Sequence, residues 1–98
     1  MNHQNRKTNN TILDMNRLTD ERIKINKIDD TILKLLEQRF DSVNQIKKIK
    51  KNNNIPILNK NRETEIYDKI YESYSALYVY LKPIYETIIC ESKQYQNH

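Results

Sequence analysis

Apolar residues recur every three or four positions over residues 18–51, a stretch that contains neither proline nor glycine. This spacing is typical of one face of an α-helix. It predicts a single helix of roughly 30 residues, about 45 Å long at 1.5 Å per residue. The apolar positions of the predicted inner face are Ile25, Ile28, Ile32, Leu35, Leu36, Val43, Ile46 and Ile49. Such a helix is too long for a compact monomer of 98 residues, which indicates a partner chain.

The pattern breaks at the three asparagines of 52–54, and Pro56 favours extended backbone over 55–58. Asn59 is suited to cap a second helix, which we expect to end between residues 75 and 80. Pro83 fits the first turn of a third helix that runs to about Gln96. The predicted inner faces of these two helices are Ile66, Ile70, Tyr74 and Leu77, and then Leu81, Tyr85 and Ile88.

Residues 1–17 are polar and rich in asparagine. We predict a disordered tail over 1–17 and a helical domain over 18–98. The expected fold class is all-α, with three helices per chain and a long first helix.

Composition excludes several function classes. The chain has no glycine, so it lacks the glycine-rich loops that bind phosphate in Rossmann and P-loop proteins. Cys90 is the single cysteine, which rules out an intrachain disulfide and a cysteine-rich zinc site. No apolar run approaches the ~18 residues of a membrane span, and the N-terminus lacks the apolar stretch of a secretion signal. We therefore expect a cytoplasmic protein.

Three cations lie on the inner stripe of the first predicted helix: Arg22, Arg39 and Lys50. A buried cation without a partner is costly, so something negative should meet them. Their stems can instead reach outward to water, or internal Asp and Glu can pair with them. The stripe of the third helix continues into Ser92 and Gln96, whose neutral groups can form hydrogen bonds in the same cavity.

Distance along the helix separates these cations into two groups. Arg39 and Lys50 are about 16 Å apart along the axis and nearly in angular register, so both can touch one small ligand. Arg22 is about 25 Å from Arg39, which is too far for the same ligand within one chain. If Arg22 has a function, another subunit must complete its site.

The sequence resembles the all-helical (type II) class of chorismate mutases over roughly residues 20–96. The resemblance is carried by the order and spacing of several short segments. These are 22–29 (RIKINKID), 32–39 (ILKLLEQR), 46–50 (IKKIK), 55–57 (IPI), 61–63 (NRE) and 82–89 (KPIYETII), followed by Ser92 and Gln96.

The resemblance implies an intertwined homodimer, in which each site borrows Arg22 from the partner subunit. It implies the Claisen rearrangement of chorismate to prephenate, in the shikimate route to phenylalanine and tyrosine. This pericyclic step uses no metal and no cofactor. The substrate is a dianion, which would supply the partners that the stripe cations lack.

The resemblance also implies a role for each matching residue. Lys50 and Gln96 would donate hydrogen bonds to the ether oxygen, whereas Arg39 and the partner's Arg22 would bind the carboxylates, with help from Lys50 and Ser92. Glu63 would accept from the ring hydroxyl, and Arg62 would balance its charge. The family often has aspartate where this chain has Asn59, so the contact with the C4 substituent differs here.

Other functions remain open from the sequence. The same scaffold can serve an isochorismate-pyruvate lyase, a mutase for 4-amino-4-deoxychorismate, or an inactive relative that keeps the fold. The net charge of +4 also suits a basic helical dimer that binds nucleic acid through Lys47, Lys48 and Lys51. Against this last function, the negative C-terminal end of a helix favours lysines there without any nucleic acid.

Overall fold

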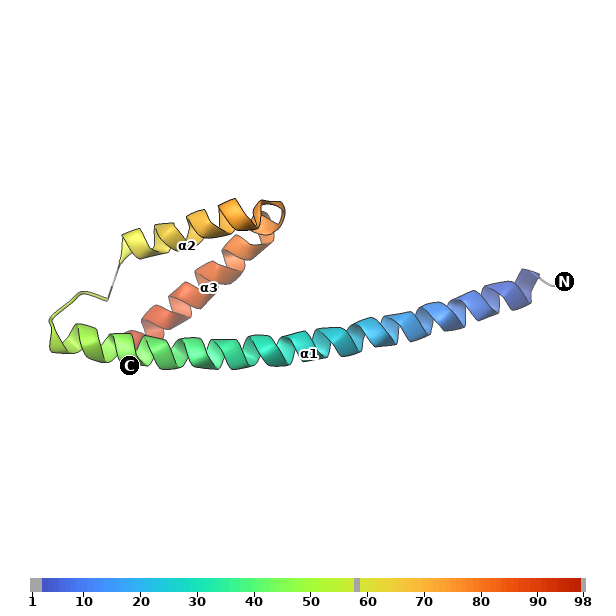
Figure 1. Cartoon of the computed structure of the whole chain (residues 1–98), viewed down its shortest axis with the longest axis horizontal. Helices are drawn as coiled ribbons and strands as arrows, with labels where there is room; N and C mark the ends of the chain where they lie inside the picture. The colour runs from blue at the N-terminus through green and yellow to red at the C-terminus, as the bar shows by residue number, and fades with distance from the viewer. Residues whose placement is uncertain (1–2, 58, 98) are drawn as a thin grey trace. The chain divides into compact units, whose positions relative to one another are not determined.

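The structure is a computed structural model that describes residues 3–57 and 59–97. Its elements are α1 (His3–Asn52), α2 (Lys60–Ser73), the short 3₁₀-helix η1 (Ser75–Leu77) and α3 (Tyr78–Asn97) (Figure 1). No strand occurs in these ranges, so the predicted all-α class with three helices is confirmed. None of the helices described has an apolar stretch of the length that crosses a membrane. The chain divides into two compact units, residues 1–37 and 38–98.

Residues 3–17, which the sequence predicted to be a disordered tail, are helical and belong to α1. The first proline of the chain is Pro56 and there is no glycine, so nothing stops the helix of 18–51 from extending towards the N-terminus. An ion pair one turn apart, Arg17 with Asp14 at 3.7 Å, lies in this extension. A domain boundary at residue 18 stays a prediction.

The unit formed by residues 1–37 exposes the apolar stripe that the sequence predicted to face inward. Ile25, Ile28 and Ile32 are 53%, 56% and 47% exposed in the single chain. Polar pairs such as Lys24 with Glu21, at 3.0 Å, lie on the same helix. This part of α1 therefore has an apolar face that is exposed within its own unit.

In the second unit, α1 ends in a turn that uses asparagine where many helices use glycine. Asn54 has a φ of 54°, the left-handed conformation that asparagine tolerates better than most residues. The N–H of Ile55 donates to the carbonyl of Lys50 at 2.8 Å, and that of Asn54 to Lys51 at 3.5 Å. These bonds satisfy the last carbonyls of α1 and confirm that the asparagine run stops the helix. Of the expected extended segment, Leu58 lies outside the described residues.

Asn59 caps α2, as the sequence predicted. Its backbone is extended, and its side-chain oxygen accepts from the N–H of Arg62 at 3.0 Å. The helix ends at Ser73, two residues before the predicted range, because Tyr74 leaves the helical region with a ψ of 42°. The short η1 then leads directly into α3.

The prediction that Pro83 lies in the first turn of α3 is wrong. The helix begins five residues earlier, at Tyr78, and contains Pro83 in its interior. Proline cannot donate to the carbonyl four residues back, which belongs to Val79. Val79 is 75% exposed, so water can satisfy that carbonyl and the helix continues through the proline.

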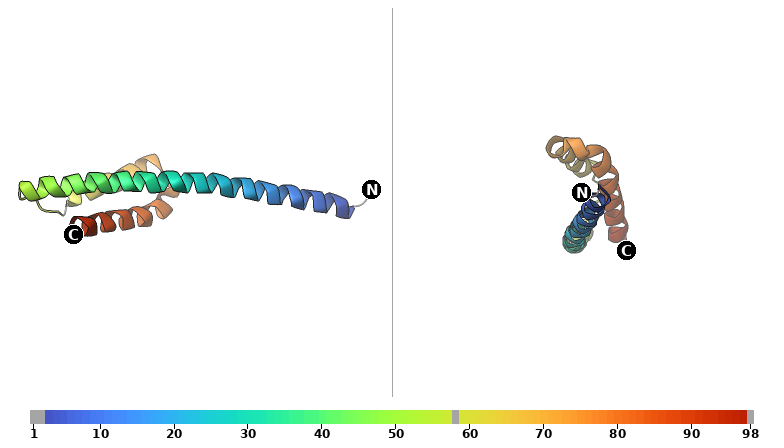
Figure 2. Two further views of the ribbon diagram at one scale, coloured as in Figure 1. Left: turned by 90° about the horizontal axis from the view of Figure 1, so that it is seen from below. Right: turned by 90° about the vertical axis from the view of Figure 1, so that its right-hand side faces the viewer.

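The core of the second unit is small and joins three helices. Val43 of α1, Ile70 of α2 and Ile89 of α3 are its buried apolar side chains among the described residues. Two aromatic contacts extend it: Phe40 with Tyr95, whose ring centroids are 5.1 Å apart, and Tyr71 edge-on to Tyr78 at 5.3 Å. Figure 2 shows α2 and α3 beside the carboxyl-terminal turns of α1, which belong to this unit. The loss of one buried side chain should therefore lower the free energy of unfolding substantially.

Replacing Ile70 with alanine should lower the free energy of unfolding by about 2–4 kcal/mol, because it removes a buried apolar side chain from a small core. The matched control is Ile84→Ala on α3, where the side chain is exposed and the loss should stay below about 1 kcal/mol. Urea unfolding at one fixed protein concentration measures both. Equal losses in the two variants would contradict this assignment of the core.

Candidate active site

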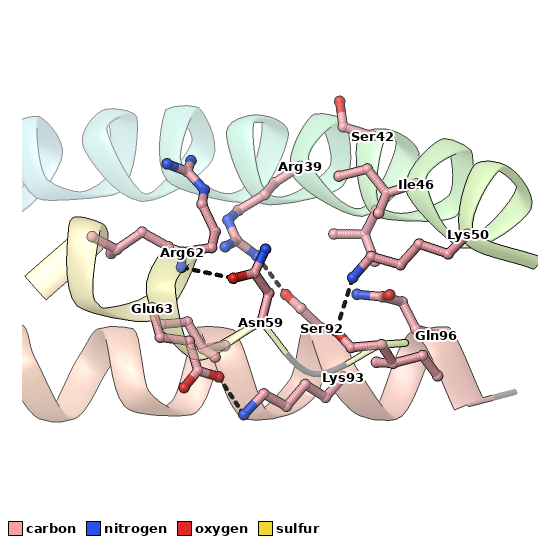
Figure 3. A pocket seen from close by; sticks show the side chains of 14 residues that line it. Arg39, Ser42, Ile46, Lys50, Asn59, Arg62, Glu63, Ser92, Lys93 and Gln96 are labelled. Carbon is pink, nitrogen blue, oxygen red and sulfur yellow. Dashed lines mark hydrogen bonds and ion pairs between the residues drawn. The ribbon is translucent and has the colours of Figure 1, made fainter. Parts of the chain in front are cut away.

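A pocket with a cavity volume of about 270 Å³ lies in the second unit, between the last turns of α1, the start of α2 and the end of α3 (Figure 3). Apolar side chains form part of its wall, and most of its polar groups are cationic or neutral. Its lining residues are Arg39, Ser42, Val43, Ile46, Lys50, Ile57, Asn59, Arg62, Glu63, Ile66, Ile89, Ser92, Lys93 and Gln96.

Arg39 reaches the pocket from α1 and donates from Nη1 to the hydroxyl oxygen of Ser92. Ser92 is buried on α3, and its own proton goes to the carbonyl of Ile88 at 2.7 Å. The hydroxyl therefore acts as an acceptor towards Arg39 and holds the guanidinium between two helices. Other N–H groups of the guanidinium remain for a further acceptor.

Lys50, near the end of α1, is half-buried, and its ammonium donates to the carbonyl of Ile57 at 2.8 Å. Ile57 belongs to the connection that follows the left-handed turn at Asn54. The connection thus returns towards the last turn of α1 and fixes the ammonium at the pocket. Two of its three protons remain for other acceptors.

Gln96 extends from the last turns of α3 towards Lys50. Its Oε1 is enclosed and receives no hydrogen bond from the described residues. In Figure 3 the amide nitrogen of Gln96 and the ammonium of Lys50 are directed towards the same region. Because Lys50 keeps two protons beyond its bond to Ile57, the two nitrogens can both donate to one ligand oxygen at that point.

Asn59 and Arg62 form the α2 side of the pocket. Because the Asn59 oxygen accepts from the backbone N–H of Arg62, the NH₂ group is the end of this side chain left to face a ligand. The guanidinium of Arg62 pairs with Glu65 at 3.2 Å on the exposed surface of α2. The start of α2 thus presents donors to the pocket.

Glu63 is the carboxylate among the lining residues, and the ammonium of Lys93 pairs with its Oε1. Glu63 lies in the first turns of α2, and Lys93 follows Ser92 on α3. Sequence reasoning missed Lys93, because it lies about 100° around the helix from Ser92 and off the predicted stripe. Its approach to Glu63 depends on how α2 packs against α3.

The charges of Glu63 and Lys93 also affect the pKa of Tyr67, one turn after Glu63 on α2. Partial burial raises the pKa of the Tyr67 hydroxyl, and the negative charges of Glu86 and Glu63 raise it further, while Lys93 opposes them.

The charges of the pocket do not balance. Lys93 has Glu63 and Arg62 has Glu65, but no carboxylate in the described part of the chain pairs with Arg39 or Lys50. Neutral oxygens of Ser92 and Ile57 hold both cations. Such a site suits a small anion with several oxygen acceptors.

A model of the family described as chorismate mutase type II matches residues 21–97. The chain belongs to this family. Comparisons with curated proteins and with solved structures found no match. The type II chorismate mutase family is all-α, in agreement with the helices described here.

The pocket brings together all but one of the residues to which the family resemblance gave a role. From α1 come Arg39 and Lys50, from α2 and its cap Asn59, Arg62 and Glu63, and from α3 Ser92 and Gln96. Arg22 belongs to the other unit, so this pocket is built without it. Its role in a type II chorismate mutase site of this chain stays a prediction.

Proposed function

We propose that the protein is a chorismate mutase that converts chorismate to prephenate, on the route to phenylalanine and tyrosine. The observation that carries this proposal is the pair of cations, Arg39 and Lys50, that line one small pocket without a carboxylate partner. Chorismate brings two carboxylates and an ether oxygen, which are the acceptors that the pocket lacks. Family membership supports the same reaction class.

The reaction is an isomerisation, in which the ether C–O bond breaks while a C–C bond forms within one molecule. The protein has to hold the substrate in a compact chair-like conformer, which is catalysis by positioning. Arg39 binds a carboxylate through the N–H groups that Ser92 leaves free. Val43, Ile66 and Ile89 form the apolar part of the pocket wall, against which the substrate would pack.

Negative charge grows on the ether oxygen as the C–O bond lengthens. Lys50 and Gln96 aim their nitrogens at one region of the pocket, where this oxygen would lie (Figure 3). Donors placed in advance bind the transition state better than the ground state. At the other end of the ring, Glu63 accepts a hydrogen bond from the hydroxyl.

The dimer is part of the proposal. A groove of about 580 Å³ next to the pocket is lined by apolar side chains of α2, η1 and α3, and Arg39 and Arg62 line both cavities. We assign this groove to the exposed isoleucine stripe of a second copy, whose Arg22 lies one turn before Ile25. Arg22 of the partner subunit then reaches the rim that the two arginines share and binds a substrate carboxylate.

The purified protein should consume chorismate faster than the spontaneous reaction, as followed by the loss of chorismate's ultraviolet absorbance. Lys50→Met should lower kcat by about a hundredfold or more, because it removes a donor from the ether oxygen. The matched control is Lys48→Met, an exposed lysine on the same helix outside the pocket, which should keep full activity. Consumption at only the spontaneous rate by folded protein refutes the proposal.

Gln96→Glu should be active only at acid pH, since a carboxyl donates to the ether oxygen only while it is protonated. With an ordinary carboxyl pKa of about 4.3, its rate should fall about tenfold per pH unit above pH 5. Gln94→Glu, on the same helix but outside the pocket, should follow the wild-type profile. A pH profile of kcat measures all three proteins, and a wild-type profile for Gln96→Glu would remove Gln96 from the ether oxygen.

Two inactive variants should restore activity to each other when their subunits are mixed. In a dimer of Arg22→Ala with Lys50→Met, one site carries both changes and the other carries neither, so random mixing returns about a quarter of the wild-type rate. The control mixture is Arg39→Ala with Lys50→Met, which leaves each site one defect and should stay inactive. Refolding the mixtures from urea and assaying chorismate loss decides whether Arg22 acts across the interface.

A further inference from the structure

The ion pair between Glu63 and Lys93 reduces the net negative charge at one end of the pocket. Both side chains are partly enclosed, with 24% of Glu63 and 37% of Lys93 exposed, and the pair connects α2 to α3. In Figure 3 it lies at the α2 side, away from Lys50 and Gln96. The carboxylate that lines the pocket is therefore already compensated by a cation before a substrate arrives.

Asn59 acts on the same end of the pocket in the same direction. Its oxygen is used by the backbone of Arg62, so the group left for a ligand is an NH₂ donor. Arg62 and Lys93 add two further cations nearby. A ligand at this end meets several hydrogen-bond donors, the Glu63–Lys93 ion pair and the guanidinium of Arg62, which pairs with Glu65.

A hydroxyl and an ammonium differ sharply in such surroundings. A hydroxyl donates one proton, here to Glu63, and accepts through its lone pairs from a donor such as the Asn59 NH₂. An ammonium has three donors and no acceptor, and Lys93 repels its charge. Glu63 alone would attract it, but Lys93 cancels much of that attraction.

We propose that Lys93 is a specificity-determining residue, which together with Asn59 makes this site select a ring with a neutral hydroxyl over one with an ammonium in the same place. This inference rests on the proposed function, because it takes the ring substituent of chorismate to lie beside Glu63. Lys93 touches the substituent's partner rather than the reacting atoms. It is a positioning residue that sets the preference for substrate.

The alternative role for the same ion pair is structural: it only holds α2 against α3. The two roles give different results. If the ion pair is only structural, its removal lowers the free energy of unfolding and affects kcat/KM for chorismate and for an ammonium-bearing analogue equally. If Lys93 is a specificity residue, its removal changes the ratio of the two kcat/KM values.

The experiment compares kcat/KM for chorismate with that for 4-amino-4-deoxychorismate, which carries the ammonium in place of the hydroxyl. In Lys93→Met, the ratio of amino to hydroxy substrate should rise about two- to fivefold, the size of one partly exposed charge interaction. Lys93→Arg should restore the wild-type ratio. Lys82→Met, an exposed lysine of α3 outside the pocket, is the matched control and should leave the ratio unchanged.

Asn59→Asp tests the second half of the inference. It keeps an oxygen for the cap of α2 and adds a negative charge, so it should raise the same ratio without any change at Lys93. An unchanged ratio in Lys93→Met, in a protein that converts chorismate, overturns the inference and leaves the proposed function intact. Wild-type protein that is folded but converts neither substrate overturns both.

Discussion

Positive charge held between helices by neutral oxygens is the constraint on which this site depends. A guanidinium and an ammonium taken partly out of water need partners, and a protein carboxylate would satisfy them most fully. Here Arg39 has the Ser92 hydroxyl and Lys50 has the Ile57 carbonyl, which position the two groups without neutralising them. The pocket's carboxylate, on Glu63, is withheld by Lys93. The cationic pair is thus left for an anion that comes from outside.

Local sequence rules predicted much of the fold and of the candidate site. The apolar period located the helices, and the cap at Asn59 was confirmed. Two of the three cations that interrupt the stripe, Arg39 and Lys50, line the pocket with Ser92 and Gln96. The errors have physical causes. Pro83 is tolerated inside α3 because the carbonyl it leaves unpaired belongs to an exposed residue, and Lys93 depends on the packing of α2 against α3, which no local pattern contains. The functional roles themselves came from the family resemblance.

The small core and the proposed site have the same origin. Few apolar side chains are buried within one chain, while the isoleucines near Arg22 remain exposed. In the assembly we propose, covering that stripe adds burial and delivers an arginine to the neighbouring pocket at the same time. Stability and substrate binding would then depend on one association, so that a change that weakens it lowers both.

Lys50 is tied to the α1–α2 connection at two points. Its backbone carbonyl accepts from Ile55, and its ammonium donates to the carbonyl of Ile57. The left-handed turn at Asn54 determines where both of these partners lie, in a chain that has no glycine for that conformation. The α1–α2 connection therefore fixes the position of the Lys50 ammonium. Substitutions in these few linking residues would shift the Lys50 ammonium, and so change the rate of the reaction, while every helix stays in place.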